Sequence, residues 1–137
     1  ELGMKNSITR MYQKGDVVIA LNGQGKTRAT TGILEIETTS NQSVASLSPK
    51  TGLNSIYLYF NLKYRYQELR DLTGDKQRSG LNLKLLRNLK LSLPPIELQE
   101  KFALLVSQTR MLGNKQKEST LEIDKIYTSL IEKTASA

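Results

Sequence analysis

Apolar positions divide this chain into short patterned segments followed by one long helical stripe. Runs rich in β-branched or alternating residues predict strands over 16–21, 28–37, 43–47 and 90–93. Helical spacing of leucine and tyrosine predicts a helix over 54–72, with Asn54 or Ser55 as its cap, and a shorter one over 81–89. The polar segments between these runs predict turns and loops. This order, without regular strand–helix alternation, predicts an α+β, β-rich domain with flanking helices.

Residues 95–137 carry a heptad pattern that begins directly after Pro94. Steps of three and four residues alternate without interruption, which is typical of a helix that forms a coiled coil. We expect this helix to pair through Leu98, Phe102, Leu105, Leu112, Ile123, Ile126 and Leu130. At about 1.5 Å per residue it would be roughly 60 Å long. A domain made of residues 1–94 cannot cover such a stripe, so we expect a second helix from a longer parent chain or from a homodimer partner.

A hairpin of two shorter helices is the alternative for this segment. Gly113 and Asn114 could form its turn, and Thr109, Gln116 and Ser119 make the middle of the stripe polar. The heptad phase nevertheless continues through Gly113 without a shift, and a turn gives no reason to keep that phase. The pattern therefore favours one continuous helix, in which a polar layer can select the register of pairing.

Charge is concentrated in the front part of the chain. The 137 residues contain 20 Lys and Arg against 13 Asp and Glu, a net charge of +7. Residues 1–94 hold 14 cations and 7 acids, whereas residues 95–137 hold 6 of each. A cationic front part and a neutral tail predict that the front part binds an anionic partner, with nucleic acid the first expectation and a membrane surface the second.

Several classes of function are excluded by composition. The sequence contains no cysteine, histidine or tryptophan. A disulfide framework, a His/Cys zinc site and a Ser-His-Asp triad are therefore impossible within the chain. No apolar run is long enough to span a membrane, and no signal-peptide pattern opens the sequence, so we expect a cytoplasmic protein without a membrane partner.

Two segments loosely resemble catalytic motifs. Residues 20–27 fit a relaxed phosphate-binding loop with Ala20 in place of the first glycine, but that loop needs a helix starting at Lys26. The β-branched residues that follow predict a strand instead, which leaves nucleotide binding as a minor alternative. Glu35 and Glu37 place two acids on one strand face, but no lysine follows at nuclease spacing.

Nucleic-acid binding is the remaining interpretation of the cationic front part. Two loops concentrate amide and cationic side chains, and a third adds amides without charge. Such groups neutralise phosphates and read base edges in the major groove. The candidate DNA-binding residues are Asn22, Gln24, Lys26, Thr27, Arg28, Asn41, Gln42, Lys76, Gln77 and Arg78.

An ordered set of short segments resembles the specificity (S) subunit of type I restriction-modification enzymes. The segments are Lys14-Gly15-Asp16-Val17-Val18-Ile19, Asn41-Gln42-Ser43-Val44, Tyr57-Leu58-Tyr59, Gly80-Leu81-Asn82 and Leu91-Ser92-Leu93-Pro94-Pro95-Ile96-Glu97-Leu98-Gln99. The last of them matches the family's junction between the target-recognition domain and its long helix. Leu98 departs from the family pattern, in which an acidic residue is commoner before the glutamine. The resemblance implies that 1–94 is a target-recognition domain lacking its N-terminal part.

The resemblance also implies a division of labour. The domain would read one half of a split site in double-stranded DNA, and the helix 95–137 would pack against a second recognition half and set the spacing. Modification subunits would carry S-adenosylmethionine and methylate adenine, and a restriction subunit would cleave. This chain would hold no cofactor and perform no catalysis. The alternative from the residues alone is an assembly module whose helix dimerises and whose front part binds a protein.

Overall fold

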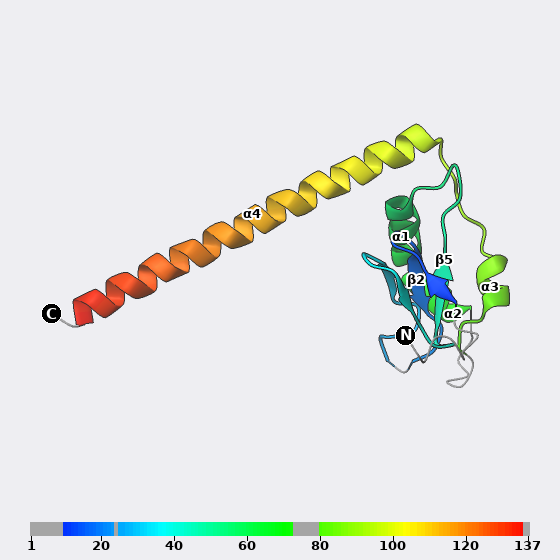
Figure 1. Cartoon of the computed structure of the whole chain (residues 1–137), viewed down its shortest axis with the longest axis horizontal. Coiled ribbons are helices and arrows are strands. Elements are labelled where there is room, and N and C mark those ends of the chain that lie inside the picture. Colours follow the sequence, from blue (N-terminus) through cyan, green and yellow to red (C-terminus); the bar gives the residue numbers. More distant parts are fainter. Residues whose placement is uncertain (1–9, 24, 73–79, 136–137) are drawn as a thin grey trace. The chain divides into compact units, whose positions relative to one another are not determined.

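The computed structural model describes residues 10–23, 25–72 and 80–135, and the fold is α+β (Figure 1). Contacts divide the chain into two compact units, residues 1–100 and residues 101–137, so the division falls inside the last helix. We call the described residues of the first unit the head. Its strands are β1 (Met11–Tyr12), β2 (Val17–Ala20), β3 (Thr31–Ile33), β4 (Thr38–Thr39) and β5 (Val44–Leu47). The helices are α1 (Ser55–Tyr64), α2 (Tyr66–Asp71), α3 (Leu83–Arg87) and α4 (Ile96–Ala135).

Strand β2 is the centre of an antiparallel sheet with the order β3-β2-β5. Its register places Val17 opposite Ile33 on one side and Leu47 on the other. The predicted strands 16–21 and 43–47 are thereby confirmed, whereas the predicted strand 28–37 shrinks to its three central residues. Two short strands, β1 and β4, form a separate ladder that the sequence pattern did not predict.

The core lies where α1 and α2 cover this sheet. Val17 and Ile19 of β2 are fully buried, as are Leu62 of α1 and Leu69 of α2. Burying such a side chain contributes about 1.5–3 kcal/mol. Helix α1 contacts β2, β3 and α2, so one layer of helices packs on the sheet.

The predicted helix 54–72 is two helices rather than one. Asn54 caps α1 as expected, because its Oδ1 accepts the N–H groups of Ile56 at 2.9 Å and Tyr57 at 3.3 Å. The helix stops at Arg65, whose backbone (φ −87°, ψ 15°) leaves the helical region. The Arg65 guanidinium is held by both carboxylate oxygens of Glu68, at 2.5 and 2.7 Å, so side-chain bonds fix this junction.

The predicted strand 90–93 is wrong, since the described residues 89–95 form neither strand nor helix. Side chains take the place of a neighbouring strand along this linker. Three alternate carbonyls accept hydrogen bonds, from Arg65 Nη1 to Lys90 (2.7 Å), from Tyr57 Oη to Ser92 (2.7 Å) and from Gln99 Nε2 to Pro94 (2.8 Å). The alternating apolar residues of 90–93 therefore have the pattern of a strand, but no neighbouring strand in the described part of the chain pairs with them.

Gln99 joins the first turns of α4 to the rest of the head. Its side chain is 1% exposed. Besides the bond to Pro94, Nε2 donates to the carbonyl of Gly52 at 3.1 Å, and Oε1 accepts the Asn54 N–H at 3.0 Å. The Gln99 amide thus acts as both hydrogen-bond donor and acceptor. Because Asn54 caps α1 and Gln99 lies in the first turn of α4, this one buried side chain connects the starts of two helices.

Helix α4 is continuous over 40 residues, as the heptad phase predicted. The hairpin alternative is excluded because residues 113 and 114 lie within the helix. Space around Gly113 is open, since a Cβ added there would meet nothing within 4 Å. Within the described ranges, no helix combines the length and the apolar character needed to cross a lipid bilayer.

Candidate nucleic-acid interface

The end of β2 is the meeting point of three chain segments that the sequence singled out. The Leu21 N–H donates to the carbonyl of Ser43 at 2.8 Å, and the Leu21 carbonyl accepts the Leu81 N–H at 2.8 Å. Asn22 follows immediately, and a Cβ added to Gly80 would lie 2.8 Å from the Leu21 carbonyl oxygen. Only a glycine allows this close approach. The start of the β2–β3 loop, the start of β5 and the segment before α3 are therefore neighbours.

The β2–β3 loop contains half of the predicted contact residues. It turns through left-handed backbone at Gly23 (φ 130°), Gly25 (φ 63°) and Ala29 (φ 68°). The Ala29 N–H bonds the carbonyl of Ala20 at 2.9 Å and closes the loop. Asn22, Lys26 and Thr27 are exposed, whereas Arg28 is half-buried. Among the described residues of the loop, the predicted contacts Asn22, Lys26 and Thr27 are thus at the surface.

Two side chains of α2 donate hydrogen bonds to backbone carbonyls of this loop. Tyr66 Oη donates to the Lys26 carbonyl at 2.8 Å. Arg70 Nη1 donates to the carbonyls of Gly25 at 2.6 Å and Arg28 at 3.2 Å. The same nitrogen lies 3.2 Å from Tyr66 Oη, and the guanidinium carbon lies 5.4 Å from the centre of the Tyr66 ring. No local pattern in the sequence pointed to these two residues.

The loop does not have the architecture of a nucleotide-binding loop. Residues 25–30 form turns and a non-regular segment and lead into β3, so the required helix is missing at Lys26 within this described stretch. Glu35 and Glu37 lie in the bend between β3 and β4 rather than on a strand face. Among the described residues, no group of three or more His, Cys, Asp or Glu side chains could hold a metal ion.

Asn41 and Gln42 lie on the other side of the Leu21 junction, at the start of β5. Both are exposed. Asn41 Oδ1 accepts the Ser43 N–H at 3.0 Å, which closes a turn and leaves the amide nitrogen of Asn41 available. Gln42 has no such local constraint in the described structure, so it is the better placed of the two to adapt to a partner.

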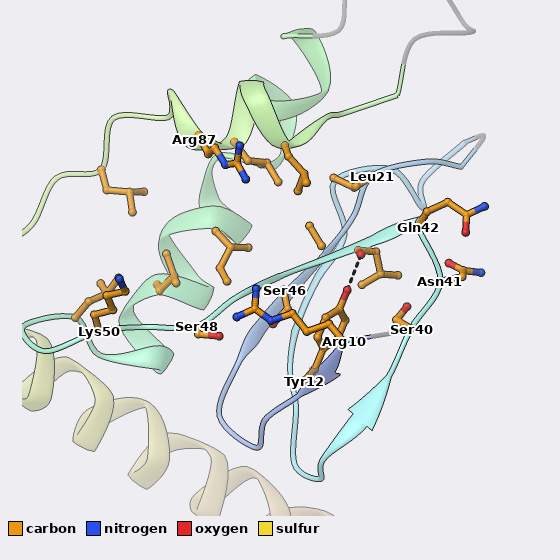
Figure 2. A pocket seen from close by; sticks show the side chains of 18 residues that line it. Arg10, Tyr12, Leu21, Ser40, Asn41, Gln42, Ser46, Ser48, Lys50 and Arg87 are labelled. Carbon is orange, nitrogen blue, oxygen red and sulfur yellow. Dashed lines mark hydrogen bonds between the residues drawn. The ribbon is translucent and has the colours of Figure 1, made fainter. Parts of the chain in front are cut away.

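A groove of about 960 Å³ runs from Asn41 and Gln42 along β5 toward α3 (Figure 2). Its floor is apolar, formed by leucines of the sheet, the helices and the linker. Arg10, Lys50 and Arg87 also line it, and no acidic residue is among the described lining residues. These three cations were not predicted from the sequence, because they are far apart in the chain and only the fold gathers them around one groove.

Asp16 lies beside this groove and is satisfied within the head. It is 6% exposed, and its Oδ2 accepts Ser46 Oγ at 2.7 Å and the Gln13 N–H at 3.1 Å. Burial raises the pKa of Asp16, but the hydrogen bonds from Ser46, Ser48 and Gln13 outweigh it and bring the pKa below its ordinary value. The Gly15–Asp16 pair of the resemblance is thus a structural element that fixes β2 to β5.

Some of the predicted contacts fall where no structure is described. Gln24, Lys76, Gln77 and Arg78 lie outside the described residues. The described Leu72 and Gly80 flank the segment that holds three of them, and Gly80 lies at the Leu21 junction. The assignment of these four residues to DNA contact stays a prediction.

The predicted pairing face of α4 is exposed throughout its described part. Leu98, Phe102, Leu105, Leu112, Ile123 and Ile126 are between 36% and 67% exposed, and the Leu130 side chain is outside the description. Further exposed apolar residues widen the stripe, at Leu104 and Met111 in the first half and at Tyr127 and Ile131 in the second. An exposed apolar stripe of this kind is typical of an interaction surface.

Comparison with known proteins identifies the family of this chain. A sequence profile named type I restriction modification DNA specificity domain matches residues 1–122. The chain belongs to this family. This match confirms the resemblance that the sequence segments indicated. The description of the family assigns it to DNA specificity, so we refer to the chain as the specificity domain.

Individual relatives agree with the family. The specificity domain is 28% identical over 138 residues to the type I restriction enzyme MjaIX specificity subunit of Methanocaldococcus jannaschii, an alignment that covers 96% of this chain and 30% of that protein. Its fold is similar to the crystal structure of the HsdS subunit from Thermoanaerobacter tengcongensis, with a TM-score of 0.58, 24% identity and coverage of 74% of this chain and 23% of the other.

A second solved structure, described as the structural basis underlying complex assembly and conformational transition of the type I R-M system, matches with a TM-score of 0.64. Identity is 22%, and the match covers 82% of this chain and 27% of that chain. These structural similarities show that the chain shares the fold of the two solved proteins. The specificity domain spans less than a third of the length of each relative named here.

Proposed function

We propose that this chain recognises one half-site of double-stranded DNA for a type I restriction-modification system. The observation that carries the proposal is the junction at Leu21, where the start of the β2–β3 loop, the turn before β5 and the pair Gly80–Leu81 adjoin at one end of the sheet. Sequence is read by side chains that reach base edges, and several loops gathered at one place provide them. The family match over residues 1–122 supports the same role.

The exposed residues divide naturally between two kinds of contact. Lys26 is a point charge at the tip of the β2–β3 loop and suits a phosphate, whereas Asn22 and Gln42 can bond base edges. Arg10, Lys50 and Arg87 extend the cationic surface along the groove. Arg28 is half-buried, so we assign it a smaller share of the contact than Lys26.

Helix α4 is the spacer in this proposal. Its exposed apolar stripe would pack against the helix of a second recognition half, in a longer parent chain or in a homodimer. Modification and restriction subunits would then supply adenine methylation, with S-adenosylmethionine bound to the modification subunit, and DNA cleavage. The chain itself would select the site and leave catalysis to those partners, in the cytoplasm.

Selection from a pool of random duplexes tests the proposal. The 137-residue chain should enrich a short common sequence, and its affinity should fall as salt rises, because phosphate contacts release counterions. Lys26→Ala should reduce the slope of log affinity against log salt by about 0.9, whereas Lys117→Ala in α4 should leave it unchanged. Absence of any retained duplex at low salt would reject DNA recognition and favour the assembly-module alternative.

A further inference from the structure

We propose that Tyr66 and Arg70 are positioning residues for DNA specificity, which act by fixing the conformation of the β2–β3 loop. The inference rests on the proposed function and extends it to two residues whose side chains bond the backbone of the loop. Both belong to α2, and both side chains are half-buried.

Their hydrogen bonds engage three carbonyls within four residues of loop. Arg70 Nη1 bonds the carbonyls of Gly25 (2.6 Å) and Arg28 (3.2 Å), and Tyr66 Oη bonds that of Lys26 (2.8 Å). Because Tyr66 Oη also accepts from Arg70 at 3.2 Å, the two side chains form one connected unit. Hydrogen bonds from a charged donor are stronger than those between neutral groups, so the guanidinium dominates the unit.

A loop of this composition needs an external support. Gly23 and Gly25 both have positive φ, and glycine gives the unfolded chain more conformations than any other residue. Within the loop, Thr30 donates from Oγ1 to the Lys26 carbonyl at 2.9 Å and from its N–H to the Thr27 carbonyl at 3.0 Å, and the bonds from α2 add to these. Fixing the carbonyls on the α2 side restricts the backbone on which Lys26 and Thr27 stand, and base readout requires side chains held in a defined geometry.

Substitutions at these two residues can change the geometry of the loop without changing the net charge of the domain. Tyr66→Phe removes one hydroxyl and no charge, so the number of phosphate contacts is unchanged. Arg70→Lys keeps the charge, but one ammonium group on a different stem cannot reproduce the planar guanidinium contacts. Tyr64→Phe is the matched control, because Tyr64 is 93% exposed two residues before Tyr66 and makes no such bond in the described structure.

The test compares the full chain with these three variants in the random-duplex selection. We expect Tyr66→Phe and Arg70→Lys to relax the preference at one or two base pairs by about threefold to tenfold. The salt slope of Tyr66→Phe should equal that of the parent. Trypsin should cleave after Lys26 several times faster in both variants and at the parental rate in Tyr64→Phe.

The outcomes separate the two proposals. A parent chain that enriches a sequence while Tyr66→Phe and Arg70→Lys show unchanged base preferences overturns the positioning role and leaves DNA recognition in place. Unchanged trypsin cleavage in both variants overturns it as well, since the loop would then not depend on α2. A parent chain that enriches no sequence overturns both proposals.

Discussion

Replacing Gln99 should destabilise the head more than any exposed substitution nearby. The Gln99→Ala variant removes three hydrogen bonds, to Gly52, Asn54 and Pro94, from a side chain that is 1% exposed. A typical intramolecular bond contributes about 1 kcal/mol, and a buried partner left unsatisfied costs about 1–3 kcal/mol. We therefore expect the free energy of unfolding to fall by about 3 kcal/mol, which for a unit of this size lowers Tm by at least about 12 °C.

Urea unfolding of the full chain, followed by circular dichroism and by hydrogen exchange, measures this effect. The Asn54 N–H should exchange faster in Gln99→Ala, because Gln99 Oε1 is its acceptor. Glu100→Gln is the control, since Glu100 is the exposed neighbour and such substitutions stay within about 0.5 kcal/mol. A loss below about 1 kcal/mol in Gln99→Ala, with unchanged exchange at Asn54, would refute the view that this amide joins the two helix starts.

The Gln99→Glu variant tests the same contacts through the pH dependence of stability. The new carboxylate would face the carbonyls of Gly52 and Pro94, to which the present Nε2 donates. Those contacts disfavour the charged form, so the pKa of the new group should rise on folding. The variant should then be most stable below about pH 4.3, the ordinary value for Glu, and lose stability as pH rises through the folded pKa. A stability difference from the parent that does not change between pH 4 and pH 7 would contradict this reasoning.

Three further predictions concern other positions. The pKa of Asp16 is lowered, so its contribution to stability is present above about pH 3.9 and is lost as pH falls through the folded pKa. Asp16→Asn should therefore flatten the acid limb of a curve of stability against pH. An unaltered acid limb would argue against this role of Asp16. Gly113→Ala should stabilise α4 by about 1 kcal/mol in urea unfolding, because the added methyl meets no atom within 4 Å, and a loss of helicity would contradict this. Gly80→Ala should cost about 1–3 kcal/mol, because its Cβ would lie 2.8 Å from the Leu21 carbonyl oxygen, and a neutral effect in thermal melting would show that the junction can open.

Local pattern was sufficient for the elements that depend on local physics. A β-branched run predicted β2 and an alternating run predicted β5, Asn54 was correctly named as a possible cap, and the heptad phase predicted an unbroken α4 through Gly113. These features follow from periodicity and from hydrogen bonds between residues two to four apart. The short family segments could also be identified, but their sequence did not reveal the physical role of Asp16, Gly80 or Gln99.

Features that depend on distant residues were not predictable from one sequence. Arg70 bonds Gly25 across 45 positions, and Gln99 bonds Gly52 across 47, so neither contact leaves a trace in periodicity. The linker shows the converse error, because alternation at 90–93 indicated a strand although only side chains were available to satisfy its backbone. The three groove cations likewise share a surface only after β5 and α3 come together.

The linker before α4 is held in one register by three side chains of the head. Its carbonyls at Lys90, Ser92 and Pro94 accept hydrogen bonds from Arg65, Tyr57 and Gln99, respectively. Each extended residue spans about 3.3–3.6 Å, so an insertion or deletion between Lys90 and Pro94 would move at least one of these carbonyls out of reach of its donor. We therefore expect the length of this connection to be fixed.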